Sequence, residues 1–228
     1  MTIEPQTLTR GAGAAAVAAG VIFIGVQIGH PHLDADSITT TEMTVRGSLK
    51  VLMAVLTLVG LTGMYLSQVR RNGVLGLVGY LVYAAGFLLI TATSLVSAYV
   101  LPAIADTDRD YVSSVLEAAS NGTASSDIGA LEIILQAQGF GYLAGGLLFG
   151  IALFRAGVLT RWACVLLAVS GVVSAALTVL PDAFYRLLAY PNGIAMVVLG
   201  YSLWRTTRST PEATATVPGE RVATVGAK

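Results

Sequence analysis

Long apolar segments, separated by short polar connections, follow one another along the chain as far as about residue 205. A membrane hydrocarbon core of about 30 Å requires about 20 helical residues, with roughly 17 as the lower limit. Six apolar runs reach that length, and they predict helices over residues 11–29, 50–69, 73–101, 131–154, 161–180 and 186–204. The pattern therefore predicts an all-α fold, a polytopic bundle of six transmembrane helices within residues 1–205.

The ends of these runs carry residues that commonly end membrane helices. Arg70 and Arg71 follow the second run, Pro102 the third, Arg155 the fourth and Pro181 the fifth. The tail over residues 206–228 is rich in Thr, Ala, Pro and Gly and has no apolar period. We expect this tail to be disordered and cytoplasmic.

The first apolar run has an alternative interpretation as a secretory signal peptide, because Arg10 supplies a short positive region before it. The run is about 19 residues long, however, and the residues after Gly29 offer no A-x-A-like cleavage site. These two features favour a retained membrane helix.

Composition supports a membrane protein. Of the 228 residues, 55% are hydrophobic and only 11% charged, against about 25% charged in an average soluble domain. A lone soluble globule is therefore excluded, and the expected surroundings are a lipid bilayer. The net charge of +0 gives no sign of a nucleic-acid partner. The single Cys164 excludes a disulfide framework and a cysteine-based metal cluster.

The connections alternate in charge, which predicts orientation through the excess of Lys and Arg in cytoplasmic loops. With both termini cytoplasmic, the inner side holds most of the basic residues: Arg10, Arg70, Arg71, Arg155, Arg161, Arg205, Arg208, Arg221 and Lys228. The outer side then holds most of the acids: Asp34, Asp36, Glu42, Asp106, Asp108, Asp110, Glu117, Asp127, Glu132 and Asp182. We expect a multi-pass protein of the bacterial inner (plasma) membrane.

The long outer loop between the third and fourth helices contains a helix signal of its own. Asp110 is a good N-cap for a short helix over residues 111–120, which Asn121 and Gly122 would end. The acids of this loop also imitate the spacing of an EF-hand, but Tyr111 replaces the glycine that its sharp turn requires. An acidic helix start is the favoured interpretation.

Small residues four apart recur within the predicted spans, as in Gly141 with Gly145 and Gly146 with Gly150. Such rows let helix backbones approach closely in lipid. They favour packing within one bundle, and a homo-oligomer or a membrane partner is the alternative. The two hairpins around the basic turns at residues 70–73 and 155–161 share their orientation. Duplication could explain this, but so could plain hairpin topology.

Polar residues at membrane depth gather toward the outer side. Pro191 interrupts the last helix beside Asn192, and broken helices at this depth often form binding sites in transporters. A simple kink is the alternative. Together these positions predict an outward-facing pocket with seven candidate lining residues, Glu132, Gln136, Ser94, Ser97, Asn192, His30 and Lys50.

The segment from His30 to Asp36 gathers two imidazoles and two carboxylates, which are donor types that suit Zn²⁺ or Cu²⁺. Four ligands within seven residues, interrupted by Pro31, rarely converge on one ion without partners from elsewhere. A polar, pH-responsive loop is therefore favoured, and we predict no metal ion and no cofactor.

The sequence contains no P-loop, HExxH, GxSxG or CxxC motif, so it predicts no catalytic residue. The leading prediction is a membrane protein that binds or passes a small or lipid-like molecule through the pocket. One alternative is a membrane-embedded enzyme acting on a lipid or isoprenoid, with Glu132 or Asp182 as acid. The other is a non-catalytic regulatory or structural subunit.

Three segments resemble a known group. They are the stretch GFGYLAGGLLFGIALFRAGVLTR from Gly139 to Arg161, the turn RRNGVLG from Arg70 to Gly76, and the helix end at residues 99–102. Together they resemble uncharacterised bacterial six-helix integral membrane proteins, often actinobacterial, that are grouped only as domains of unknown function. The resemblance covers about residues 45 to 180. It implies the six-helix fold and carries over no functional residue.

Overall fold

The computed structural model describes residues 4–31, 33–176 and 189–206, and 84% of these residues are helical, with no strand among them. The long helices are α1 (Pro5–Gly25), α2 (Thr41–Leu66), α3 (Val69–Leu95), α6 (Ala130–Ala156), α7 (Arg161–Ala176) and α9 (Tyr190–Thr206). The short elements are η1 (Ser37–Thr39), η2 (Val96–Val100), α4 (Leu101–Ile104) and α5 (Arg109–Asn121). The predicted all-α fold is confirmed.

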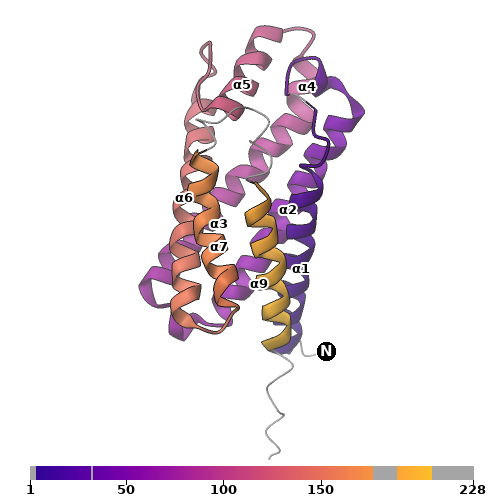
Figure 1. The fold of residues 1–228 in the computed structure, drawn as a ribbon. Coiled ribbons are helices and arrows are strands. Elements are labelled where there is room, and N and C mark those ends of the chain that lie inside the picture. The colour runs from indigo at the N-terminus through magenta and orange to yellow at the C-terminus, as the bar shows by residue number, and fades with distance from the viewer. Residues whose placement is uncertain (1–3, 32, 177–188, 207–228) are drawn as a thin grey trace, which may run out of the picture.

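The long helices run up and down and form a closed ring (Figure 1). Around the ring α1 packs against α2, α2 against α3, α3 against α6, α6 against α7, α7 against α9, and α9 against α1. Helix α5 lies across one end of the bundle, while the N-terminus and the end of α9 lie at the other (Figure 1). Each long helix therefore has two long-helix neighbours and leaves its outer side exposed.

Helices long and apolar enough to cross a membrane are present. Within the described residues there are four, over Pro5–Gly25, Thr41–Leu66, Val69–Ile104 and Ala130–Ala156. The described parts of α7 and α9, at 16 and 17 residues, are shorter. The outward sides of the long helices carry exposed apolar residues, such as Val55 on α2, Leu81 on α3 and Val169 on α7. An apolar outer surface of this kind is typical of helices that face lipid.

Most basic and most acidic residues lie at opposite ends of the bundle, which we call the basic end and the acidic end. The basic end holds the arginines of the termini and of the short turns, Arg10, Arg70, Arg71, Arg155, Arg161 and Arg205. The acidic end holds the acids of the longer connections, Asp34, Asp36, Glu42, Asp106, Asp108, Asp110, Glu117, Asp127 and Glu132. The halves of the bundle next to them are called the basic half and the acidic half below.

The short helix of the long connection forms, but with a different cap from the predicted one. Asp108 is the N-cap of α5, and its carboxylate accepts the backbone N–H of Tyr111 at 3.2 Å. Asp110 lies inside the first turn, where an acid also favours the helix dipole. Gly122 ends the helix in the left-handed conformation, with φ of 79°, as its position after Asn121 predicted. The acidic helix start is therefore confirmed.

The third span agrees with its prediction at the start and differs from it at the end. Gly73, with φ of 57°, breaks α3 near its start, so the regular helix begins after the basic turn. We had expected Pro102 to end the helix, but the helix continues past it. The chain widens into the π-helical η2 just before it and continues through α4. A π turn changes the hydrogen-bond pattern before a proline that lacks an N–H, which explains how the helix passes Pro102.

The first helix begins at another residue than expected, and the predicted start of the last helix lies outside the described residues. Helix α1 starts at Pro5, six residues before the predicted 11, because proline suits a first helical turn. It ends at Gly25, and Gly29 has a φ of 61° in the following turn. The described part of the last helix begins at Tyr190, so Pro191 lies in its first turn. The predicted spans up to 180 and from 186, Pro181, Asp182 and the tail beyond 206 lie outside the described residues.

Small residues hold the helices of the basic half close together. A Cβ added to Gly145 would lie 2.4 Å from the backbone of Tyr83, and one added to Gly86 would lie 2.8 Å from the backbone of Gly141. Gly150 meets Ala168 in the same way. Since the hydrophobic effect gives no drive between helices in lipid, this backbone contact is an important source of stability. The sequence rows of small residues in α6 therefore pack inside the bundle.

Candidate functional site

A cavity of about 750 Å³ occupies the acidic half of the bundle. Helices α1, α2, α3 and α6 contribute its walls, and α5 contributes its cover. Binding sites for small molecules usually have volumes of about 300–1,000 Å³ and combine apolar walls with a few polar groups. The cavity falls within this range and has both kinds of lining.

The cavity lining is layered along the bundle axis, as the order of residues on each helix shows. Its floor is apolar and made by Phe23, Met53, Ile90 and Tyr142. About one helical turn closer to the acidic end lies a polar belt, made by Gln27, His30, Lys50, Thr93, Ser94 and Gln138. Above the belt the lining is mixed. Its apolar residues are Leu33, Met43, Leu101, Val115, Leu116 and Leu131, and its polar or charged residues include Arg46, Ser97, Glu117, Glu132 and Gln136. A ligand would therefore meet an apolar floor below a polar belt.

Two side chains of the belt, His30 and Lys50, contact each other. Lys50 Nζ lies 3.2 Å from His30 Nε2, and His30 Nδ1 lies 2.8 Å from the carbonyl oxygen of Pro31. A carbonyl only accepts, so Nδ1 carries the proton and Nε2 accepts from the ammonium group. The pair joins the turn after α1 to α2.

Arg46, one turn above Lys50, ties the same two segments together. Its guanidinium donates to the carbonyl oxygens of Val26 and Gly29 at 2.9 and 3.1 Å and pairs with Glu42 at 2.8 Å. Carbonyls at a helix end have no intrahelical partner, so the arginine satisfies the end of α1. In the cavity wall, Arg46 therefore acts mainly to hold the end of α1 against α2.

The opposite wall, formed by α6, carries amides and a carboxylate. Gln136 Nε2 lies 3.5 Å from Glu132 Oε1, one turn along the same face. Further in, the hydroxyl of Thr93 on α3 donates to the amide oxygen of Gln138. The carboxylate of Glu132 therefore lies near the cover, and the belt itself has neutral amide and hydroxyl groups on this side.

The wall that α3 provides contains the π-helical segment η2. Ser94 lies just before η2 and Ser97 lies within it, and both line the cavity. Segments of π-helix often occur at functional sites, because they turn side chains out of the regular α-helical register. Here η2 contributes Val96 and Ser97 to the cavity lining.

Six of the seven predicted residues line this cavity: Glu132, Gln136, Ser94, Ser97, His30 and Lys50. The seventh, Asn192, is placed elsewhere. It is fully buried and absent from the cavity lining, and its Oδ1 accepts from the hydroxyls of Tyr83 at 3.0 Å and Ser170 at 3.4 Å. A role in binding stays a prediction for all seven, but the surroundings of Asn192 are those of a residue that joins α3, α7 and α9.

Sequence reasoning missed several residues of the lining. Gln138 and Tyr142 lie one turn apart on α6, on the face that also carries Leu131 and Leu135. A count that continues the step from Glu132 to Gln136 does not reach them. The second helix was predicted to begin at residue 50, which placed Arg46 in the outer loop, but Arg46 lies within α2. Nothing in the sequence indicated that the buried side of α5, with Val115 and Leu116, covers the cavity.

The predicted metal candidates have other roles in the structure. The carboxylate of Asp34 accepts the backbone N–H groups of Asp36 and Ser37, at 3.1 and 2.7 Å, and so shapes the turn before η1. Within the described ranges no three metal-ligating side chains come together. His32, one of the four candidate ligands, lies outside those ranges.

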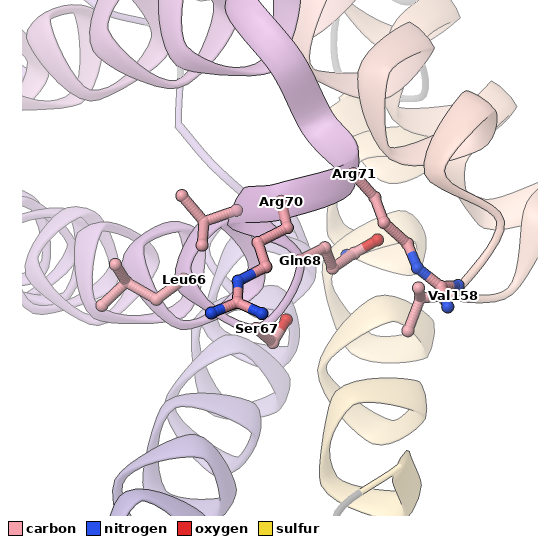
Figure 2. A pocket seen from close by; sticks show the side chains of 7 residues that line it. Leu66, Ser67, Gln68, Arg70, Arg71 and Val158 are labelled. Atoms are coloured by element: carbon pink, nitrogen blue, oxygen red, sulfur yellow. The ribbon is translucent and has the colours of Figure 1, made fainter.

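A second, smaller pocket of about 480 Å³ lies at the basic end, in the turn between α2 and α3 (Figure 2). Its lining residues are Leu66, Ser67, Gln68, Val69, Arg70, Arg71 and Val158. This pocket is separate from the cavity of the acidic half, with which it shares no lining residue.

No family model matches the chain, and no curated protein or solved structure matches it either. The resemblance to bacterial six-helix membrane proteins therefore stays a prediction.

Proposed function

We propose that this protein is a six-span membrane protein that binds a small or lipid-like molecule in the cavity of its acidic half. The observation that carries the proposal is the lining of that cavity. A polar belt with Lys50 and Gln138 lies above an apolar floor, inside a bundle whose outer surface is apolar. A ligand with one polar group and an apolar body would match this order of layers.

The orientation follows from the charge separation. Six arginines gather at the end where the described termini lie, and most of the described acids gather at the other end. The positive-inside rule then supports cytoplasmic termini and a cavity that opens outward. A bacterial inner membrane is the corresponding location.

The experiment measures binding of radiolabelled decanol and decanoate to the purified full chain in maltoside detergent. Saturable binding of about one molecule per chain is expected. Gly139 lines the cavity and has no atom within 4 Å of an added Cβ, so Gly139→Phe should fill the space and reduce binding at least about tenfold. Gly11→Phe is the matched control, because Gly11 also faces open space but lies outside the cavity.

Binding that does not saturate, or that survives Gly139→Phe while the variant keeps its thermal midpoint, would contradict the proposal. The alternatives give other results in the same preparation. A lipid-acting enzyme would change the chemical identity of a lipid probe, and a subunit would purify with a stable partner. Flux of the probe in vesicles would indicate passage rather than binding alone.

A further inference from the structure

The turn between α2 and α3 presents two cations beside a pocket. Arg70 and Arg71 are exposed at its rim, and Figure 2 shows their guanidinium groups on either side of the Gln68 side chain. Arginine is well suited to phosphate, because its planar donors can bind two oxygens at once. The helical dipole adds to this, since the positive end of α3 lies at the same turn.

Gln68, in the pocket lining, has a buried hydrogen-bond acceptor without a partner. Its side chain is only 3% exposed, and Nε2 donates to the carbonyl oxygen of Met64 at 3.3 Å, which identifies the two ends of the amide. The other end, Oε1, has no partner within the described structure. Asn72, one turn further, repeats the pattern with an unpartnered Oδ1. Such buried acceptors are rare, so a donor from outside the chain is indicated.

The apolar residues around the pocket indicate where that donor comes from. Leu66 and Val69 are 62% and 45% exposed, and both line the pocket beside the arginines. The pocket thus lies where the apolar outer surface of the bundle meets its basic end. In a membrane-spanning bundle this is the level of the phospholipid headgroups.

From this arrangement we infer that the turn binds a phospholipid whose headgroup carries a hydrogen-bond donor beyond its phosphate. The phosphodiester would lie against Arg70 and Arg71, and the donor would reach Gln68 Oε1. Phosphatidylglycerol, with hydroxyls, and phosphatidylethanolamine, with an ammonium group, both meet the description, whereas phosphatidylcholine has no donor. The inference rests on the membrane placement proposed above and is independent of the cavity in the acidic half.

The test measures the thermal midpoint of the purified full chain in maltoside as dioctanoyl phosphatidylglycerol, phosphatidylethanolamine or phosphatidylcholine is added. We expect phosphatidylglycerol and phosphatidylethanolamine to act at about tenfold lower concentration than phosphatidylcholine. Gln68→Met should remove this difference and keep a weaker response to all three. The double variant Arg70→Gln/Arg71→Gln should lose the response, whereas Arg155→Gln, which removes an exposed arginine of the same end outside the pocket, should keep it.

Equal responses to the three lipids in the unaltered chain would overturn the inference, as would an unchanged response in the double arginine variant. If inorganic phosphate alone stabilises as well as the lipids do, the site binds free phosphate and the lipid assignment is wrong. Should Gln68→Met not fold, the arginine pair compared with Arg155→Gln decides, because these side chains are exposed. Decanol binding in the same variants tests the cavity separately.

Discussion

The two halves of the bundle use the same helices in opposite ways. In the basic half, α3 and α6 touch through their backbones, with Gly86 against Gly141 and Gly145 against Tyr83. In the acidic half the same two helices line the cavity, and the side chains of Thr93 and Gln138 join them by a hydrogen bond. The two helices therefore meet through backbone where their residues are small, and through polar side chains beside the cavity.

The cover of the cavity is a separate hydrophobic unit. Val112, Ile38, Leu101 and Ile128 are buried together at the acidic end, apart from the main core around Phe87 and Phe149. The main core closes the ring of long helices, whereas the outer cluster joins α5 to the ring. We therefore expect the two halves to respond differently to substitution.

The largest effect is expected from breaking the backbone contact in the basic half. Gly145→Ala places a Cβ 2.4 Å from Tyr83 Cα, where only the backbone could move, so α3 and α6 must separate. We expect a loss of about 3 kcal/mol in the free energy of unfolding, at the upper end for overpacked cores. Denaturant unfolding of the purified chain in detergent measures it.

Gly139→Ala is the matched control on the same helix, since nothing lies within 4 Å of its added Cβ. It should leave stability nearly unchanged. Equal losses in the two variants would show that the packing difference between the halves does not matter for stability.

An intermediate and local effect is expected from the cover. Val112 is 0% exposed within the outer cluster, so Val112→Asp places a carboxylate where it has no partner and should release α5. Trypsin should then cleave after Arg109 at least about tenfold faster, while the thermal midpoint of the bundle changes little, because α5 takes no part in the ring of long helices.

Ala119→Asp adds the same carboxylate at an exposed position of α5 and should not speed cleavage. If Val112→Asp lowered the midpoint as strongly as Gly145→Ala, the cover and the ring would form one cooperative unit, and the comparison between the halves would fail.

The smallest effect is expected from the ion pair between α5 and the turn before η1. Arg109 contacts Asp36 at 2.6 Å, but both side chains are largely exposed. The Asp36 hydrogen bond raises the pKa of Arg109 above its usual range. A raised pKa stabilises the folded protein at every pH below the pKa that Arg109 has in the unfolded chain, so this contribution is constant between about pH 6 and pH 9. It is also small, because both side chains are exposed, so Arg109→Gln should leave the midpoint nearly unchanged across that range.

A drop in the midpoint of the Arg109→Gln variant, measured by thermal unfolding in detergent, would contradict this. It would show that the cover is held by charge rather than by its apolar cluster. Asp127→Asn, which removes a charge from the same end without breaking an ion pair among the described residues, is the control.

Much of the fold could be predicted because each helix carries its own signals. Apolar length predicted the long helices, Gly122 predicted the end of α5, and the basic turn around Gly73 was placed correctly. The errors lie where two signals compete. Pro102 was expected to end a helix but is passed through a π turn, and Asp108 caps α5 in place of its neighbour Asp110.

The candidate site was predictable in part for a similar reason. Depth along a helix can be counted from its charged end, so His30, Lys50, Ser94 and Glu132 were expected near one level, and they do line one cavity. The counting failed for Asn192, because depth does not say which neighbour a side chain faces. Tyr83 and Ser170 are distant in sequence, and only the packing of α3, α7 and α9 brings their hydroxyls to it.

The sequence by itself determined the helical class, the apolar surface and the separation of charge, since these depend on properties that each segment carries alone. Only the tertiary structure decided that the helices close into a ring, that α5 covers the cavity, and that Gln68 keeps a buried acceptor beside two arginines. The physical reason is that burial and hydrogen-bond partners depend on which helices are neighbours, and helix neighbours are chosen by packing between segments far apart in the chain.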